Sequence, residues 1–377
     1  MPDVLLRGTD HLRQVLGIPY SDEQLSAITS DPRDPSVIVA GAGSGKTEVM
    51  AARVVWLVGR GYARPDAVLG LTFTKKAAGE LAARIRRALG LLADDAGVAE
   101  FLEQQGEPTV STYHAYAGSL IAEHGLRIGL EPDLQVISDA SRFQRAAQAV
   151  QTYPGALPTS STHVPRLVQD LVALDGQLAD HLVAPAQLRR WDEELIARLS
   201  GERQVAGVRR TIEVAHQRIE LSRLVERYRE AKADAGVMDF ADQMAWGAEL
   251  AIGCPEVSRS ERDRFAVVLL DEYQDTSVAQ RRMLQGLYSG EDAAQGLGHP
   301  VTAVGDLCQA IYGWRGASAD NLTDFLEHFP TASGGRGPAL GLTVNRRCAT
   351  SILQLANDLA GPFYAESEVA RPLLARP

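Results

Sequence analysis

The stretch GAGSGKT at residues 41–47 decides the fold of this chain. It follows the apolar run VIVA (37–40) and precedes a helix-forming run over 48–58. The three runs match the pattern G-x-x-x-x-G-K-[ST] in the strand–loop–helix setting that a phosphate-binding loop requires. Glycines let the backbone N–H groups curl toward an anion, and the helix N-terminus adds partial positive charge. The alternative, a plain glycine turn, needs no Lys-Thr pair, so the sequence predicts a nucleotide site.

Two residues of this loop carry specific chemistry. Lys46 is expected to reach the outer phosphates, and Thr47 to offer its hydroxyl to Mg²⁺. The expected phosphate-binding set is Gly41, Ala42, Gly43, Ser44, Gly45, Lys46 and Thr47.

Composition is typical of a globular protein, with 45% hydrophobic and 23% charged residues among 377. The chain has no apolar run long enough to span a bilayer, and its N-terminal residues carry charges throughout. Its three cysteines show no metal-binding or disulfide spacing. These features predict a cytoplasmic protein without a membrane span. The net charge of −10 argues against a uniformly basic nucleic-acid coat but leaves room for a local basic groove.

The order of strand-like and helical runs predicts an α/β fold with an insertion. Runs rich in β-branched residues occur at 37–40, 68–74, 109–114, 265–270 and 301–306, with helical stretches between several of them. This order is typical of a parallel sheet covered by helices. Residues from about 117 to 235 are mostly helical in pattern, so the long span between Thr47 and Asp271 predicts an inserted all-helical subdomain.

The apolar run 265–270 is expected to be a central strand that ends at the acidic segment DEYQD (271–275). Asp271 at the strand end suits Mg²⁺, and Glu272 can accept a proton from an attacking water. Gln274 can orient that water or sense the terminal phosphate. The alternative is a surface acidic turn, which the upstream phosphate loop makes less favourable.

The segment VGDLCQAIYGWRGA (304–317) adds a second polar strand end followed by aromatics. Gln309 could contact a terminal phosphate, while Tyr312, Trp314 and Arg315 combine base-stacking rings with a cation. The alternative is that the two aromatics pack in the core.

Taken together, these motifs resemble superfamily 1 helicases of the UvrD/Rep/PcrA group, in the order that this family has them. Besides the segments above, the matching ones are YSDEQLSAI with Gln24, LTFTKKAAGEL (71–81), TYHAY (112–116), VMDFADQ (237–243) and LTVNRRCATSIL (342–353). The resemblance implies a RecA-like P-loop NTPase sheet with helices on both faces, ATP and Mg²⁺ as ligands, and an adenine-reading role for Gln24. It further implies 3′→5′ translocation on single-stranded DNA and unwinding at duplex junctions, in repair or recombination.

The resemblance also implies how the chain is divided. Residues 1–116 and 237–337 would form the first motor domain, called 1A, and 117–236 its insertion, 1B. Residues 338–377 would begin the second motor domain, 2A, so the chain is expected to be an N-terminal fragment. Arg347 would be the arginine finger on the γ-phosphate. The alternative function is an ATP- and DNA-binding module with little turnover of its own.

On the DNA side, the resemblance points to Phe73, Thr74, Lys75, Lys76 and His114. Arg84, Arg86 and Arg87 extend the basic run of residues 71–87, as a phosphate-binding patch or as a solvated helix face. His114 has a structural role as its alternative.

Two positions depart from the family, which has Arg and Tyr where this chain has Glu48 and Arg346. Both normally sandwich adenine. Either Arg346 stacks on the base and Glu48 holds its guanidinium, or adenine is held less tightly. The pair also resembles RecB-like, AdnB-type motors, which would imply a second helicase–nuclease subunit as partner. The chain carries no nuclease motif of its own.

Overall fold

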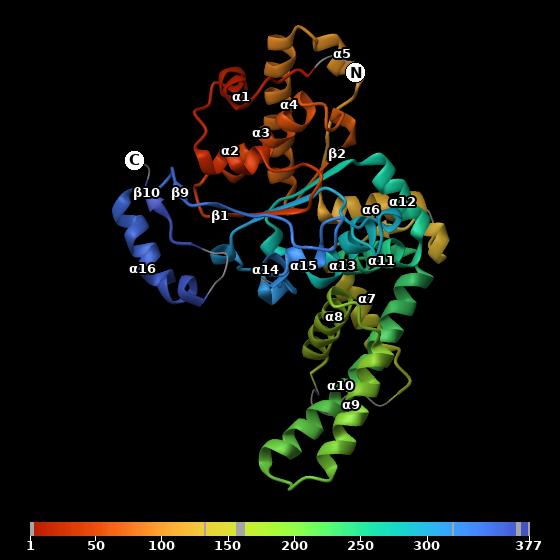
Figure 1. Cartoon of the computed structure of the whole chain (residues 1–377). Coiled ribbons are helices and arrows are strands. Elements are labelled where there is room, and N and C mark those ends of the chain that lie inside the picture. Colours follow the sequence, from red (N-terminus) through yellow and green to blue (C-terminus); the bar gives the residue numbers. More distant parts are fainter. Residues whose placement is uncertain (1–3, 132, 156–162, 319, 367–370, 376–377) are drawn as a thin grey trace. The chain divides into compact units, whose positions relative to one another are not determined.

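The computed structural model describes residues 4–131, 133–155, 163–318, 320–366 and 371–375 (Figure 1). The side chains of Phe101, Arg315 and Glu366 lie outside the described part as well. The chain divides into two compact units, one made of Met1–Tyr116 with Ala251–Pro377, the other of Ala117–Leu250. No helix of the described residues is long and apolar enough to cross a membrane.

The first unit is built on a six-stranded parallel sheet with strand order β3-β2-β6-β7-β1-β8. Its strands are β1 (Ser36–Ala40), β2 (Val68–Thr72), β3 (Thr109–Thr112), β6 (Val267–Leu270), β7 (Val301–Gly305) and β8 (Ala339–Leu342). The predicted α/β class with a parallel sheet is confirmed. β6 is a central, fully buried strand, as its uninterrupted apolar run predicts.

Helices cover both faces of this sheet. Figure 1 shows α1 to α4 on one side and α13 to α15 on the other. The helices of the unit are α1 (Thr9–Leu16), α2 (Asp22–Thr29), α3 (Lys46–Gly59), α4 (Lys75–Ala96), α5 (Ala99–Gln104), α12 (Pro255–Arg264), α13 (Val278–Tyr288), α14 (Asp320–Thr323), α15 (Phe325–His328) and α16 (Thr350–Glu366). A continuous apolar core joins the first group to the sheet, with Ile28, Ile38, Val54, Leu81 and Leu269 fully buried or nearly so. Because all strands are parallel, their carboxyl ends meet at one edge, where the site residues lie.

The structure departs from the expected boundary at residue 338. We expected 338–377 to begin a second motor domain, yet Ala339–Leu342 pairs with β1 as the edge strand β8 of the first sheet. The amide of Val37 donates to the Pro338 carbonyl at 3.1 Å, and that of Gly41 to the Leu342 carbonyl at 3.1 Å. The reason is that the exposed edge of β1 still has unpaired backbone groups, which β8 satisfies.

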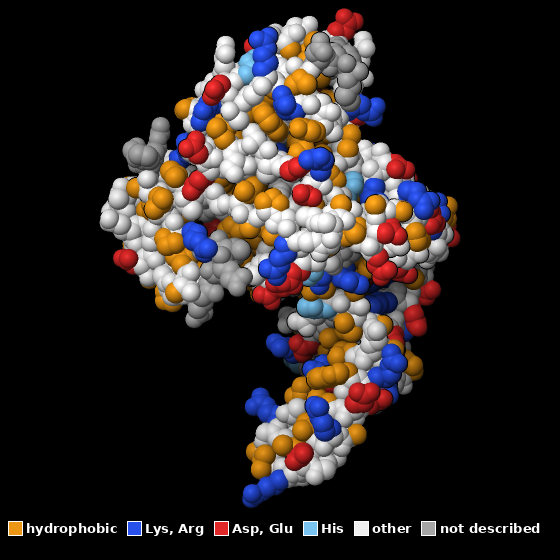
Figure 2. Space-filling view, in the orientation of Figure 1, with side chains coloured by type: hydrophobic (Ala, Val, Ile, Leu, Met, Phe, Trp, Pro, Cys, Tyr) orange, Lys and Arg blue, Asp and Glu red, His pale blue; other side chains and the backbone are white. Residues whose placement is uncertain are grey.

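The second unit is helical. Two helices, α6 (Tyr113–His124) and α11 (Phe240–Gly253), extend across its limits, and the others are α7 (Asp139–Gln151), α8 (Val164–Asp180), α9 (Pro185–Ser200) and α10 (Ala206–Asp234). Leu171, Leu224 and Tyr228 are fully buried in its core. The compact unit ends at Leu250, inside α11, and within it β5 (Val237–Met238) pairs with β4 (Gln135–Val136). On the face shown in Figure 2, charged side chains of both signs alternate with hydrophobic ones over α9 and α10.

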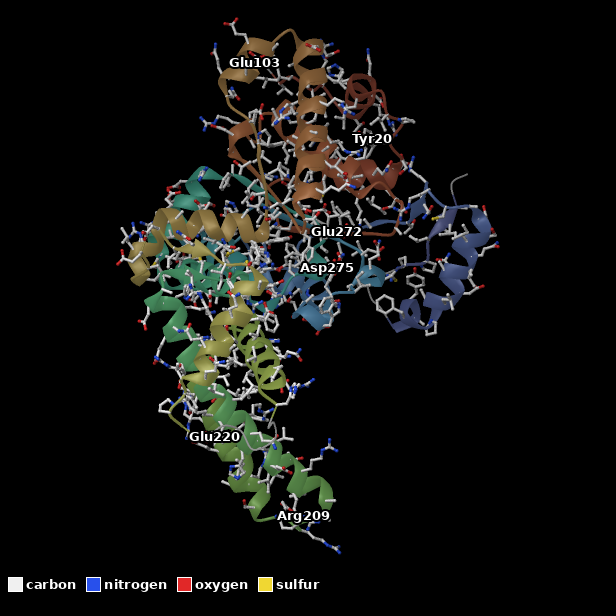
Figure 3. All side chains as sticks on the ribbon, turned by 180° about the vertical axis from the view of Figure 1, so that it is seen from behind. Tyr20, Glu103, Arg209, Glu220, Glu272 and Asp275 are labelled. Carbon is white, nitrogen blue, oxygen red and sulfur yellow. The ribbon has the colours of Figure 1, made fainter. Side chains whose placement is uncertain are left out.

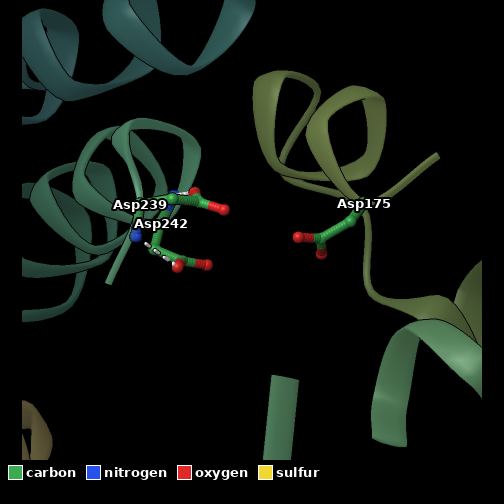
Figure 4. A group of neighbouring side chains, drawn as sticks. All are labelled: Asp175, Asp239 and Asp242. Carbon is green, nitrogen blue, oxygen red and sulfur yellow. Dashed lines mark hydrogen bonds between the residues drawn. The ribbon is translucent and has the colours of Figure 1, made fainter. Parts of the chain in front are cut away.

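A buried ionic cluster joins three helical segments of this unit. Lys232 on α10 binds carboxylate oxygens of Asp175, Asp239 and Asp242 at 3.1, 3.1 and 2.7 Å. Figure 4 shows Asp239 and Asp242 side by side, with Asp175 opposite them. Arg142 adds a 3.0 Å contact to Asp239. Lys232 therefore takes the position that a metal ion would need in this acidic group.

Candidate nucleotide-binding and hydrolysis site

The phosphate loop forms the turn between β1 and α3. Gly43 and Gly45 have φ angles of 72° and 93°, a left-handed conformation that favours glycine. α3 then begins at Lys46, so the loop leads directly into a helix N-terminus. Gln24 of α2 is buried against this loop, and its Nε2 donates to the Ser44 carbonyl at 3.1 Å. The structure thus brings Gln24 and the phosphate loop together.

The loop meets the DEYQD segment through one ion pair. Nζ of Lys46 lies 3.0 Å from Oε2 and 3.2 Å from Oε1 of Glu272. The lysine side chain is 12% exposed and the glutamate 32%. Two motifs far apart in sequence therefore meet at one point, the carboxyl end of the sheet.

Asp271 directly follows β6 and is 5% exposed. Burial, together with the negative charge of Glu272, raises the pKa of this carboxyl group to about 6. A divalent cation would stabilise such a buried carboxylate, and the Thr47 hydroxyl stands one residue past Lys46 at the start of α3. These hard oxygen ligands fit Mg²⁺.

Glu272 has a left-handed backbone, with φ 49° and ψ 42°. Its amide donates to Oδ1 of Asp271 at 3.0 Å. Figure 3 shows Glu272 and Asp275 close together, and both line one cavity. A non-glycine residue held in this region is strained, and such strain is concentrated at functional sites.

A chain of hydrogen bonds runs from Glu272 to Gln309. Nε2 of Gln274 donates to Oε2 of Glu272 at 2.8 Å, and Oε1 of Gln274 accepts from the Asp306 amide at 3.1 Å. Nε2 of Gln309 donates to Oδ2 of Asp306 at 2.5 Å. Sequence reasoning did not identify the buried Asp306 as part of the site. Its position at the end of the predicted strand 301–306 was the available signal.

A cavity of about 350 Å³ lies beside this chain. Glu272, Gln274 and Gln309 line one part, and Phe73 and Tyr312 another. The two rings stack on each other, with centroids 5.0 Å apart. The cavity therefore lies between the proposed hydrolytic groups and the proposed base-stacking rings.

Trp314 is 75% exposed, so the alternative that it packs in the core is wrong. Tyr312 is half-buried against Phe73. The side chain of Arg315 lies outside the described part of the structure.

The remaining predicted DNA residues lie around α4 and α6. The Thr74 side chain caps α4 by accepting from the Ala77 amide at 3.1 Å. Lys75 and Lys76 are exposed on the first turn of α4. His114 is partly buried on α6, and burial lowers its pKa. Of these four residues, His114 is the most buried, whereas Thr74, Lys75 and Lys76 are exposed to solvent.

The expected contact between Glu48 and Arg346 is not formed. Glu48 instead binds Arg84 of α4, with Nη1 to Oε2 at 2.6 Å, and its Oε1 accepts from the Tyr20 hydroxyl at 3.2 Å. Arg84 reaches Glu48 because α3 and α4 pack side by side. Arg346 contacts the loop through its backbone, since its amide donates to the Gly43 carbonyl at 2.9 Å. Arg84 was expected only as part of a basic patch.

A short segment after β8 covers the outer side of the phosphate loop. Asn345, in β9 (Val344–Asn345), donates from Nδ2 to the Ala42 carbonyl at 2.6 Å. Arg347 follows, with an exposed side chain. β9 pairs with β10 (Leu374–Ala375), whose neighbour Leu373 lies against Gly41. Sequence reasoning missed Asn345 and Leu373, because nothing local in the sequence places either residue at the loop.

Comparison with known proteins identifies the family. Residues 20–330 match the UvrD/REP helicase N-terminal domain, and the chain belongs to this family. DNA helicase II of Escherichia coli K12 is 29% identical over 339 residues, which cover 90% of this chain and 40% of that protein. ATP-dependent DNA helicase UvrD1 of Mycobacterium tuberculosis CDC 1551 is 29% identical over 328 residues, 86% of this chain and 37% of that protein. The chain thus spans about 40% of the length of these relatives.

Proposed function

We propose that the chain binds and hydrolyses ATP with Mg²⁺ as part of a DNA motor that moves 3′→5′ on single-stranded DNA. One observation carries the proposal. A hydrogen-bonded chain runs from Lys46 through Glu272, Gln274 and Asp306 to Gln309. Its members Glu272, Gln274 and Gln309 line the same cavity as the Phe73–Tyr312 stack. A change at the terminal phosphate therefore has a short physical route to the rings that would hold a base. The helicase names of the relatives support this assignment.

In this proposal each residue has one role. The loop amides and Lys46 bind the β- and γ-phosphates, and Thr47 and Asp271 would hold Mg²⁺, which neutralises charge on the transferring phosphoryl group. Glu272 accepts the proton of the attacking water, and Gln274 and Gln309 orient that water and sense the phosphate. When ATP binds, Lys46 must leave Glu272 and pair with phosphate instead. The Glu272 carboxylate is then free to act as base.

On the DNA side, Phe73, Tyr312 and Trp314 stack on successive bases, while Lys75 and Lys76 contact phosphates. Thr74 and His114 border this strand path in the proposal, as does Arg315. Duplex junctions are the proposed substrates, in repair or recombination. A second helicase–nuclease subunit is the proposed partner.

The second candidate function, a binding module with little turnover, is favoured by the environment of Arg347. This proposed finger follows β9, which has two residues and one two-residue neighbour, β10. Strands this short bury little and hold a side chain loosely. We infer that the 377-residue chain alone turns over slowly, because a loosely held finger contributes little and complete loss of a finger typically costs a factor of about 10³–10⁵ in rate. In domain terms, we propose that residues 117–236, which lie within the compact unit Ala117–Leu250, form the 1B insertion.

The test of the proposal is ATP–Mg²⁺ binding by the wild-type chain and by Lys46→Ala, measured by titration calorimetry. Wild-type binding with strongly weakened binding by the variant supports the site. Equal affinities for both proteins would show that the nucleotide, if it binds, does so elsewhere.

A further inference from the structure

Arg84 is held in a fixed place beside the phosphate loop. Its guanidinium binds Glu48, the residue directly after Thr47, at 2.6 Å. The second oxygen of Glu48 accepts from Tyr20, whose backbone carbonyl in turn accepts from Arg13 at 2.8 Å. Both oxygens of Glu48 are therefore engaged, and α4 is tied to α3 at the mouth of the site.

Gln24 and Tyr20 stand at the same corner of the loop as the Glu48–Arg84 pair. Gln24 is buried here against Ser44, and Tyr20 stands one residue before Ser21, whose side chain caps α2. A nucleotide with its phosphates on residues 41–47 must direct its sugar and base away from the loop. Gln24, which matches the adenine-reading glutamine of the family, marks this direction.

We propose that Arg84, anchored by Glu48, forms one wall of the nucleobase pocket and stacks its planar guanidinium on the purine of the bound nucleotide. The inference rests on the proposed function and extends it to a residue of α4. A guanidinium stacks well on aromatic faces, because it is planar and only weakly hydrated. Arg84 of α4 would thus supply the cation in this chain, whereas the family has an arginine at the position of Glu48.

Exposure and anchoring both fit this role. The Arg84 side chain is 44% exposed, so one face of its guanidinium can receive a ring, whereas its anchor Glu48 is 26% exposed. The alternative is a solvated ion pair on a helix surface. Arg86 represents that alternative on the same helix, because it pairs with Glu107 at 2.9 Å while both side chains are more than 60% exposed. Glu107 lies just before β3, away from the loop, so Arg86 is a matched control.

The experiment compares two ligands that differ in the base. ATP–Mg²⁺ and inorganic tripolyphosphate–Mg²⁺ are titrated into the wild type, Arg84→Ala, Arg84→Lys, Arg86→Ala and Lys46→Ala. We expect Arg84→Ala to weaken ATP binding roughly threefold to thirtyfold, the range of cation–π contacts from exposed to desolvated, and to leave tripolyphosphate within about twofold. Arg84→Lys should bind ATP nearly as weakly as Arg84→Ala does, because the lysine ammonium is not planar. Arg86→Ala should change neither ligand, and Lys46→Ala should weaken both.

Each of the following results would overturn the assignment. Unchanged ATP affinity in Arg84→Ala would show that Arg84 does not contact the base. Equal losses for ATP and tripolyphosphate, or full rescue by Arg84→Lys, would show that the ion pair merely positions the loop. A wild type that binds ATP no more tightly than tripolyphosphate would exclude a base pocket while leaving the phosphate site intact. Failure of the wild type to bind either ligand would instead refute the proposed function, and the Arg84 assignment with it.

Discussion

At the residue scale, the fold places the charges of Glu272 and Asp271 where they lower the stability of the folded chain. Glu272 has a left-handed backbone, which costs a non-glycine residue roughly 1–2 kcal/mol. Asp271 is buried next to it, and its amide donates to the Leu71 carbonyl at 2.7 Å. The strand end thus holds two adjacent carboxylates, with Lys46 as the counter-charge. Sites of this kind exchange stability for function.

Asp271→Asn is therefore expected to stabilise the chain while abolishing ATP hydrolysis. The pKa of about 6 in the folded state lies above the ordinary value of 3.8, so the native state binds this proton more tightly than the unfolded state. The ionised carboxylate costs stability above pH 6, up to about 3 kcal/mol, and this cost disappears as pH falls from 6 toward 4. Urea unfolding in Mg²⁺-free buffer should show the gain at pH 7.5 and little gain at pH 4.5. A variant less stable than wild type at pH 7.5 would contradict the burial argument.

At the element scale, the turn η6 (Gly313–Arg315) and the helix α10 place one functional side chain each, the first in solvent and the second in the interior. The turn η6 presents Trp314 to solvent, and α10 carries Lys232 into the interior of the helical unit. Burial lowers the pKa of Lys232, but the three carboxylates around it outweigh that effect and raise the pKa above its usual value. The ammonium therefore stays charged.

Trp314→Ala is expected to weaken single-stranded DNA binding without lowering the melting temperature. Stacking on one aromatic contributes about 1–3 kcal/mol per base, or roughly fivefold to 150-fold in affinity. The matched control is Trp191→Ala, a 54% exposed tryptophan on α9 of the helical unit. Fluorescence anisotropy with a labelled oligonucleotide measures both. Equal weakening by the two variants would show a nonspecific effect.

Lys232→Met is expected to destabilise the chain by about 3–5 kcal/mol, the cost of breaking a buried ion pair by removing one partner. The three carboxylates of Figure 4 would then lose the ammonium that they share, and Arg142 and Arg229 would still pair with Asp239 and Asp175. Arg223→Met on the same helix removes an exposed pair with Glu220 and should change stability by less than about 1 kcal/mol. Chemical unfolding, followed by the circular dichroism of the helices, measures the stability of both variants. A loss for Lys232→Met no larger than for Arg223→Met would refute the role of the cluster.

At the scale of the whole molecule, local pattern predicted most of the fold, because strands and helices carry their periodicity within a few residues. The runs 37–40 and 301–306 became β1 and β7 with ends shifted by one residue. The run 109–114 ended early, since Tyr113 and His114 begin α6. β8 was assigned to another domain, because pairing with β1 depends on contacts across 300 positions.

The sequence also predicted several residues of the candidate site. Lys46, Glu272, Gln274 and Gln309 do converge, since parallel strands bring their carboxyl ends together. Asp306 and the Glu48–Arg84 pair were missed. Both depend on side-chain packing between elements, which a local sequence pattern does not encode.

The most direct test of the central claim is steady-state ATP hydrolysis by the 377-residue chain with and without saturating single-stranded DNA. The claim is that the polar chain from Lys46 to Gln309 couples a nucleotide site to the rings beside it. It predicts a slow rate that rises when DNA is added. In Glu272→Gln both rates should fall by about 10²–10⁴, the usual contribution of a general base, while ATP binding is kept. Hydrolysis that does not respond to DNA, or that survives in Glu272→Gln, would contradict the account.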